Sequence, residues 1–282
     1  MPAARSLRST PRRARKRSDW AAFFRTLQHR SRHAWRALWR APRWTRFVAG
    51  AVAILAVWSV VNVAYQVIRK PTELFFPVSG TLTKPPGETW RQYGPLFREY
   101  STSIVTPELL AALAQAESAG DPVARTYWRW QLSWNPLKLY RPASSAVGMY
   151  QMTDAAFAEA RHYCVRNHNV VEDGPWYESH GCWLNSTYMR IIPSHAIELT
   201  AIYLDRAVTS LTAGSRFAAA TRLQKQDLAA IVHLCGAGPG EAFVRRGFRL
   251  APDERCGDHD AGAYLARVNA MKRQLRRLAE AA

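Results

Sequence analysis

Uncharged apolar residues dominate one stretch of the chain close to its first residue. Phe47 to Ile68 forms a run of 22 residues, FVAGAVAILAVWSVVNVAYQVI, in which no side chain carries a charge. At about 1.5 Å per residue a helix of this length spans roughly 33 Å, enough to cross the hydrocarbon core of a bilayer. A buried core helix would share this composition, and a cleaved signal peptide would be shorter and end in a small-residue site. We therefore expect an uncleaved, single transmembrane helix over residues 47–68.

Beyond this run the apolar positions recur with a helical period, and no strongly alternating strand pattern is present. Residues 69–88 combine Pro and Gly in a way that is typical of an extended linker. We expect a mainly α domain over residues 89–282 with at most a small β element near its cleft. The predicted helices cover residues 89–100, 106–117, 153–166, 194–211, 225–234 and 262–281.

The predicted helix at 106–117 has an acid where its apolar stripe should continue. The pair 106–107, Thr-Pro, suits a helix start, and the segment 120–122, Gly-Asp-Pro, ends the helix. The stripe runs from Leu110 to Glu117, seven residues later and in the last turn. Burial and the negative end of the helix dipole both disfavour a carboxylate, so we expect Glu117 to hold its proton near neutral pH and to act as a general acid. A solvated residue at the end of the stripe is the alternative interpretation.

Positive charge is concentrated before the apolar run. Residues 1–46 hold 14 Lys/Arg and a single acid, Asp19, and the whole chain has a formal net charge of +18. This asymmetry predicts that the tail, residues 1–46, stays in the cytoplasm. Its aromatic residues recur among arginines at roughly helical spacing, which favours contact with anionic membrane lipid over nucleic-acid binding.

All four cysteines follow the apolar run. An even count outside the cytoplasm predicts two disulfides with three possible pairings, and the short intervals favour Cys164–Cys182 and Cys235–Cys256. A zinc site is the alternative for part of this set, but its spacings match no common zinc signature, so we expect no metal and no cofactor. The residues of that alternative site are His162, Cys164, His168, His180 and Cys182.

Four short motifs follow one another in the domain. They are Glu117-Ser118 with Asp121-Pro122, then Gly148-Met149-Tyr150-Gln151, then Gly236-Ala237-Gly238-Pro239-Gly240, and Tyr264-Leu265 near the end. This ordered set resembles the lytic transglycosylases of the soluble-lytic-transglycosylase type, relatives of goose-type lysozyme that cut the glycan of peptidoglycan. The resemblance covers residues 90–275. This chain departs from the family pattern in three places. It lacks the bulky residue after Glu-Ser and the Tyr-Asn pair before Gly-x-Gly, and it contains a Trp-rich insertion before Gly148.

The resemblance implies a lysozyme-like fold and a mechanism that uses one carboxyl group. Glu117 would protonate the oxygen between N-acetylmuramic acid and N-acetylglucosamine while the 2-acetamido group assists at the anomeric carbon. Glu117 would then take the proton of the C6 hydroxyl, which closes a 1,6-anhydro ring. Asp121 is interpreted as a turn residue rather than as a second catalytic carboxylate.

Substrate contacts are carried over from the family motifs. Gln151 offers the donor and the acceptor that an acetamido group requires, and one of two adjacent serines would bind the same group. Met149 and Tyr150 would line the cleft, and for His233 a buried core residue is the alternative. The residues assigned to substrate binding are Ser144, Ser145, Met149, Tyr150, Gln151, His233 and Tyr264. The inserted residues Trp128, Trp130 and Trp134 could stack on sugar rings or form one face of a buried strand.

Together these features predict a peptidoglycan lytic transglycosylase anchored in the bacterial inner membrane, with its catalytic domain on the periplasmic side. Expected partners are glycan strands, membrane lipid and an envelope-spanning secretion or conjugation complex; nucleic acid is not expected. A lysozyme- or chitinase-type hydrolase of the same fold is one alternative. An inactive peptidoglycan-binding scaffold is the other.

Overall fold

The computed structural model describes residues 39–75, 77–172, 182, 185, 188–213 and 219–280. The chain divides into two compact units, Met1–Val63 and Ala64–Ala282. The long helix α2, Arg43–Arg69, contains the boundary between them. Its 27 residues are long and apolar enough to cross a membrane, and it is the one such helix in the described part of the chain. This finding is compatible with a single-pass membrane protein.

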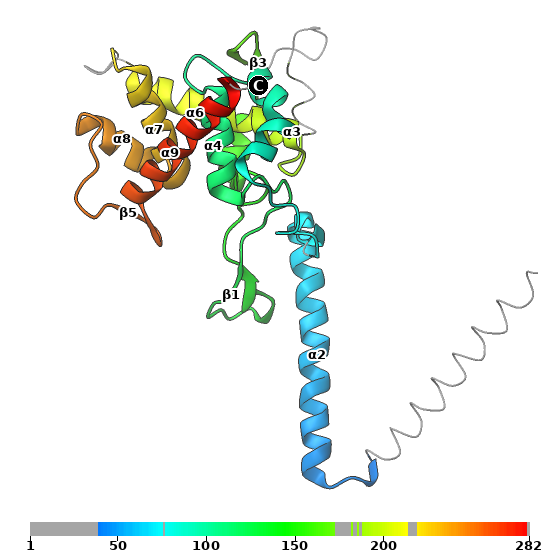
Figure 1. Ribbon diagram of the computed structural model, residues 1–282. Helices are drawn as coiled ribbons and strands as arrows, with labels where there is room; N and C mark the ends of the chain where they lie inside the picture. The colour runs from blue at the N-terminus through cyan, green and yellow to red at the C-terminus, as the bar shows by residue number, and fades with distance from the viewer. Residues whose placement is uncertain are drawn as a thin grey trace, which may run out of the picture. The chain divides into compact units, whose positions relative to one another are not determined.

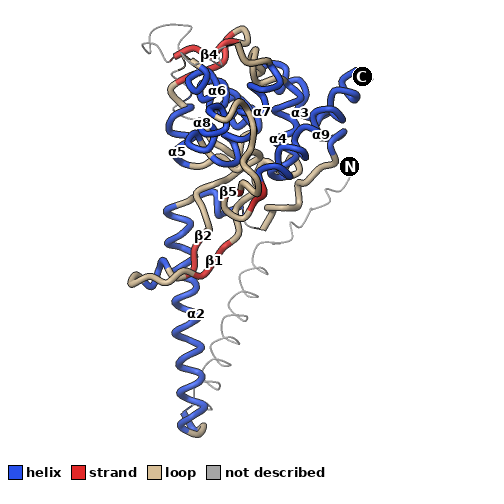
Figure 2. Tube along the Cα trace, turned by 90° about the vertical axis from the view of Figure 1, so that its left-hand side faces the viewer, coloured by secondary structure: helices blue, strands red, loops and turns tan. Residues whose placement is uncertain are grey.

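The second unit is mainly helical, with a few short strands (Figures 1 and 2). Its helices are α3 (Pro86–Glu99), α4 (Pro107–Ser118), α5 (Asp154–Ala160), α6 (Pro193–Thr212), α7 (Arg222–Cys235), α8 (Ala237–Arg245) and α9 (Ala261–Glu280). Short 3₁₀ helices are η1 (Pro71–Phe75) and η2 (Pro136–Lys138). Strands pair as three antiparallel hairpins, β1 (Trp128–Trp130) with β2 (Tyr140–Pro142), β3 (Tyr163–Arg166) with β4 (Asn169–Glu172), and β5 (Arg255–Cys256) with β6 (His259–Asp260).

Helix α4 is the central helix of this unit. It packs against α3, α6 and α9, and every residue from Leu109 to Ala114 is buried. Its sequence therefore has no solvent face until the last turn. Thr106 occupies the N-cap position without a side-chain capping hydrogen bond, and its hydroxyl accepts a hydrogen bond from the Gln226 amide. The helix ends where Ala119 adopts a left-handed conformation, with φ of 52°.

One predicted helix is too long, and one helix was not predicted. The segment 153–166 is helical only over α5, and its second half is β3, which turns into β4 through Asn167 and His168 with φ of 48° and 64°. Asn and His tolerate this left-handed region better than most residues, so they suit the turn of this hairpin. Helix α8 was not predicted, because Gly238 and Gly240 weaken the helical signal; Pro239 lies within its first turn, where a proline is tolerated.

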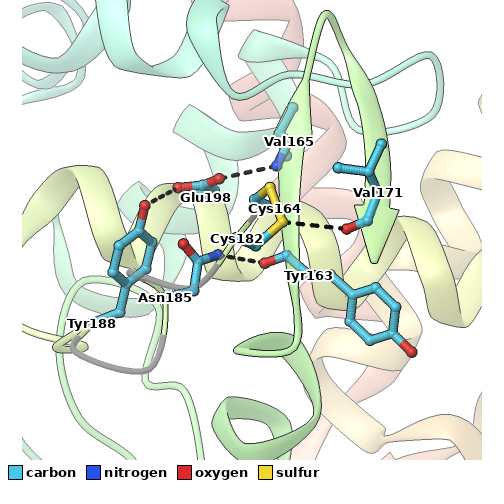
Figure 3. The surroundings of a disulfide bond; sticks show 8 residues. All are labelled: Tyr163, Cys164, Val165, Val171, Cys182, Asn185, Tyr188 and Glu198. Carbon is cyan, nitrogen blue, oxygen red and sulfur yellow. Dashed lines mark hydrogen bonds between the residues drawn. A yellow bond between two sulfur atoms is a disulfide. The ribbon is translucent and has the colours of Figure 1, made fainter. Parts of the chain in front are cut away.

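The structure joins Cys164 to Cys182 and Cys235 to Cys256, the pairing that the short intervals favour. The first disulfide lies next to a buried carboxylate, Glu198 of α6 (Figure 3). Glu198 Oε1 accepts a hydrogen bond from the Val165 backbone at 2.9 Å, and Oε2 accepts one from the Tyr188 hydroxyl at 2.7 Å. Burial raises the pKa of Glu198, and these two hydrogen bonds oppose that rise.

Candidate functional site

Glu117 lies in the last turn of α4, where the buried part of the helix meets solvent. Its side chain is 17% exposed. The Tyr264 hydroxyl of α9 donates a hydrogen bond to Glu117 Oε1 at 2.6 Å. Among the described residues none forms a hydrogen bond with Oε2. One carboxyl oxygen is thus fixed by the protein, while the other is available to a ligand.

Tyr264 is itself buried, with 3% of its surface exposed. Burial and then the neighbouring Glu117 carboxylate raise the pKa of Tyr264 well above its ordinary value, so the hydroxyl stays protonated and remains a donor. The resemblance assigned this residue to the substrate cleft. The structure brings it into direct contact with Glu117.

His233 of α7 is the second neighbour of Glu117. Its Nε2 lies 3.6 Å from Glu117 Oε1, and its side chain is nearly buried. Burial lowers the pKa of His233, against the opposing effects of Glu117 and of a hydrogen bond with the Tyr150 backbone. The imidazole is therefore neutral near pH 7, and burial keeps a cation away from the carboxyl group.

The loop from Gly148 to Gln151 is attached to the end of α4. The hydroxyl of Ser118, which follows Glu117, donates to the Met149 carbonyl at 2.8 Å. Gly148 adopts φ of +82°, and a Cβ at this position would lie 2.1 Å from the Arg190 carbonyl oxygen. Only glycine fits both requirements. The motif residues Ser and Gly therefore position this loop beside the carboxyl group.

Gln151 and His233 line the same pocket, which has a volume of about 280 Å³. The Gln151 amide donates to the carbonyls of Ala124 and Gly148 at 3.2 and 3.0 Å, so it holds the loop closed. Its contribution to a ligand is thus limited to the carbonyl side of the amide. Sequence reasoning missed two further lining residues on α6, Thr200 and Tyr203.

Thr200 is the more informative of these two. It is buried, and its hydroxyl has no hydrogen-bond partner among the described residues. An unpaired buried hydroxyl is costly to the fold, and this oxygen is buried away from the open part of the pocket. The sequence carried a signal for this residue, because Thr200 is a polar residue three positions after Ile197 on the apolar face of α6.

Met149 and Tyr150 are buried in the hydrophobic core and do not form an open surface. The Tyr150 ring packs edge-on against the His233 ring, with 6.4 Å between the ring centroids. Burial raises the pKa of Tyr150 well above its ordinary value. In this structure both residues belong to the core, and Tyr150 packs against the His233 ring of the site.

Ser144 and Ser145 lie at a different pocket. Their hydroxyls accept hydrogen bonds from the backbone of Ala146 and Asp154 at 3.2 and 3.1 Å. The pocket that they line, of about 440 Å³, also includes Lys70. The structure does not bring either serine to the pocket of Gln151 and His233.

Asp121 and the cysteines of the alternative zinc site have structural contacts. Asp121 is fully buried and accepts hydrogen bonds from the backbone of Gly80 and Val123 at 2.6 and 2.9 Å, as a turn residue does. Cys164 and Cys182 are bonded to each other, so neither is a free thiolate for a metal. His180 of that alternative lies outside the described residues.

Glu117, His233 and Tyr264 meet where three helices pack together. Three helices, α4, α7 and α9, bring together a partly exposed carboxyl group, a neutral imidazole and a protonated tyrosine, and of these three groups His233 also lines the pocket of Gln151. No protein-family model matches this chain, and no curated protein matches its sequence.

Proposed function

We propose that the protein is a membrane-anchored peptidoglycan lytic transglycosylase of the soluble-lytic-transglycosylase type, with a lysozyme-like catalytic domain over residues 89–282. The observation that carries this proposal is the state of Glu117. It ends the central core helix, is partly exposed, has one oxygen fixed by Tyr264 and has the other available. The ordered motifs around it supply the substrate class.

In the proposed reaction the Glu117 carboxyl group donates its proton to the oxygen that joins N-acetylmuramic acid to N-acetylglucosamine. The bond from the anomeric carbon to that oxygen breaks, and the acetamido oxygen of the muramic acid residue bonds to the anomeric carbon. Glu117, now a carboxylate, takes the proton of the C6 hydroxyl. The C6 oxygen displaces the acetamido group, which leaves a 1,6-anhydro end and restores the Glu117 proton.

Two neighbours of Glu117 assist this cycle without touching the substrate. The Tyr264 hydroxyl hydrogen-bonds the carboxyl group and stabilises the carboxylate that forms in the first step. Because His233 is neutral, it fills the space beside Glu117 without adding a charge. The side-chain carbonyl oxygen of Gln151 is the polar group that the pocket beside His233 offers to an acetamido group.

The proposed location is the inner membrane, with α2 as a single span and the tail, residues 1–46, in the cytoplasm. Two disulfides in the second unit support an oxidising compartment for it. Protease treatment of spheroplasts tests this topology. Digestion of the second unit in intact spheroplasts agrees with the proposal, and protection of that unit contradicts it.

Mass spectrometry of the products from purified cell-wall glycan tests the reaction. The proposal predicts chain ends with 1,6-anhydro-N-acetylmuramic acid. Reducing ends alone would identify a hydrolase of the same fold. Binding to the glycan without new ends would identify a scaffold.

A further inference from the structure

The hairpin at residues 127–142 exposes large apolar side chains at its tip. Leu132 and Trp134 are fully exposed, and Trp130 is 68% exposed. Exposure of several large apolar side chains in one short segment is unfavourable in water and marks a surface that another apolar phase covers. Figures 1 and 2 show that β1 lies apart from helices α3 to α9.

The tip is an ordered structure. The Trp128 and Trp130 rings both pack against Tyr140, with centroids 5.2 and 4.9 Å away. The Gln131 backbone N–H donates to the Leu139 carbonyl at 2.8 Å, and the Asn135 side chain accepts from the Leu137 backbone at 2.9 Å. The exposed residues are therefore held outward by a folded hairpin.

The loop that joins the two strands of the hairpin is attached to the end of the apolar helix. Gln66, in the last turn of α2, donates to the Leu137 carbonyl at 2.7 Å. It precedes Arg69, the last residue of α2, by three positions, or about 4.5 Å along a helix. If α2 spans a bilayer, this bond places the hairpin at the level of the membrane surface.

A buried ionic cluster strengthens the same attachment. Glu73 of η1 is buried, and its carboxylate accepts a hydrogen bond from the Trp128 indole at 2.8 Å. Lys70 and Arg125 form ion pairs with Glu73 at 3.2 and 3.1 Å. The chain that leaves α2 is thus bonded to the first strand of the hairpin as well as to η2.

The charge of the hairpin complements anionic lipid. Residues 127–142 contain Arg129, Lys138 and Arg141 and no acidic residue. The pocket at its base is lined by Arg69, Lys70, Lys138, Arg141 and Arg190, with Asp154 as the acidic member. Tryptophan together with Lys and Arg is the composition of segments that lie in the headgroup region of a bilayer.

We propose that the hairpin tip inserts Leu132 and Trp134 into the interfacial layer of the membrane that α2 spans. Together with α2 it gives the second unit a second point of attachment to the lipid surface. This inference rests on α2 being a membrane span and does not depend on the activity of Glu117.

Photo-crosslinking of the full-length protein in nanodiscs of phosphatidylethanolamine and phosphatidylglycerol tests the proposal. A benzophenone amino acid is placed at 132 or at 134, and matched controls carry it at Met189 or Leu223, which are exposed apolar residues elsewhere in the second unit. We expect lipid adducts from both tip positions and none from either control. Because the tip side chains are exposed, the substitutions leave the fold intact, and circular dichroism verifies this.

Three outcomes would overturn the proposal. They are no lipid adduct at the tip, equal lipid adducts at tip and control positions, and tip adducts only with a second copy of the chain or with added glycan. A second measurement uses brominated lipid as a fluorescence quencher. Replacement of Trp134 by Phe should remove part of the quenching seen in the wild type, and unchanged quenching would also contradict insertion.

Discussion

Two carboxyl groups in the same helical unit, Glu198 and Glu117, differ in burial and in their hydrogen bonds. Glu198 is 3% exposed, and both of its oxygens accept hydrogen bonds, from the Val165 backbone and the Tyr188 hydroxyl. Glu117 is 17% exposed, and the tyrosine opposite it, Tyr264, bonds only one of its oxygens. Each carboxyl group accepts a hydrogen bond from a tyrosine. The two therefore differ in solvent exposure and in whether the protein also binds the second oxygen.

This difference separates a structural acid from a candidate catalytic one. Both oxygens of Glu198 accept hydrogen bonds from the protein, and the residue lies beside a disulfide (Figure 3). Glu198 therefore has no oxygen left to contact a substrate oxygen. A carboxyl group with one occupied oxygen is held in place and still has a position for the atom that takes its proton. Burial alone therefore does not identify a general acid.

The largest effect is expected from Glu117→Gln. The amide keeps the shape of the side chain but has no proton to give, so glycan cleavage should fall by about 10³-fold. The assay is the release of soluble fragments from purified cell walls by the full-length protein in detergent. Glu198→Gln is the matched control and should keep most of the activity. Equal losses in the two variants would remove the distinction between the acids.

The next largest effect concerns stability. Glu198→Ala leaves the Val165 N–H and the Tyr188 hydroxyl without their acceptor, so the free energy of unfolding should fall by about 2–4 kcal/mol. Denaturant unfolding followed by circular dichroism measures this change. Glu241→Ala, which removes an exposed ion pair, should change stability by less than about 0.5 kcal/mol. A Glu198→Ala protein as stable as that control would show that the Glu198 carboxylate contributes nothing to the free energy of unfolding.

A smaller effect is expected when each tyrosine loses its hydroxyl. Tyr264→Phe removes a hydrogen bond to a reacting carboxyl group, so cleavage should slow about tenfold, the equivalent of about 1.4 kcal/mol. Tyr188→Phe removes the corresponding bond of Glu198 and should lower stability by about 1 kcal/mol with little effect on rate. A slower reaction in Tyr188→Phe and a normal one in Tyr264→Phe would reverse the proposed roles.

The smallest effect is a change in pH dependence. Burial lowers the pKa of His233 in the folded state below its ordinary value near 6.5. The unfolded chain therefore binds this proton more tightly, and the folded protein loses stability as the pH falls through 6.5 toward the lower folded value. His233→Gln should lessen this acid destabilisation in thermal melts recorded from pH 7 to pH 5. The control His259→Gln changes an exposed residue and should show the same acid destabilisation as the wild type.

Sequence patterns predicted the features that depend on neighbouring residues in the chain. The apolar run, the start and end of α4 and the position of Glu117 in its last turn all follow from local composition. The disulfide pairing also followed, because short intervals limit the choice. The helix predicted at 153–166 ends at Ala160, because residues 163–166 pair with residues 169–172 as a hairpin.

Contacts between distant segments could not be predicted in the same way. Tyr264 and His233 reach Glu117 because α9 and α7 pack in one core, and no spacing in the sequence encodes a distance of 2.6 or 3.6 Å. The family motifs marked Tyr264 as a cleft residue without indicating its bond to Glu117. Glu198 and Thr200 were not predicted to be buried, because the helical period of α6 was followed only through its apolar residues.

Proton donation by Glu117 is tested most directly by varying the leaving group in the first turnover. One substrate is a natural glycan. The other is an N-acetylglucosaminyl-N-acetylmuramic acid disaccharide with a 2,4-dinitrophenyl group on its anomeric oxygen, which leaves as 2,4-dinitrophenolate without needing a proton. If Glu117 is the acid, Glu117→Gln should lose most of its rate on the glycan and retain a much larger share of the wild-type rate on the dinitrophenyl substrate. The same fractional loss on both substrates, or no loss on the glycan, would contradict the account.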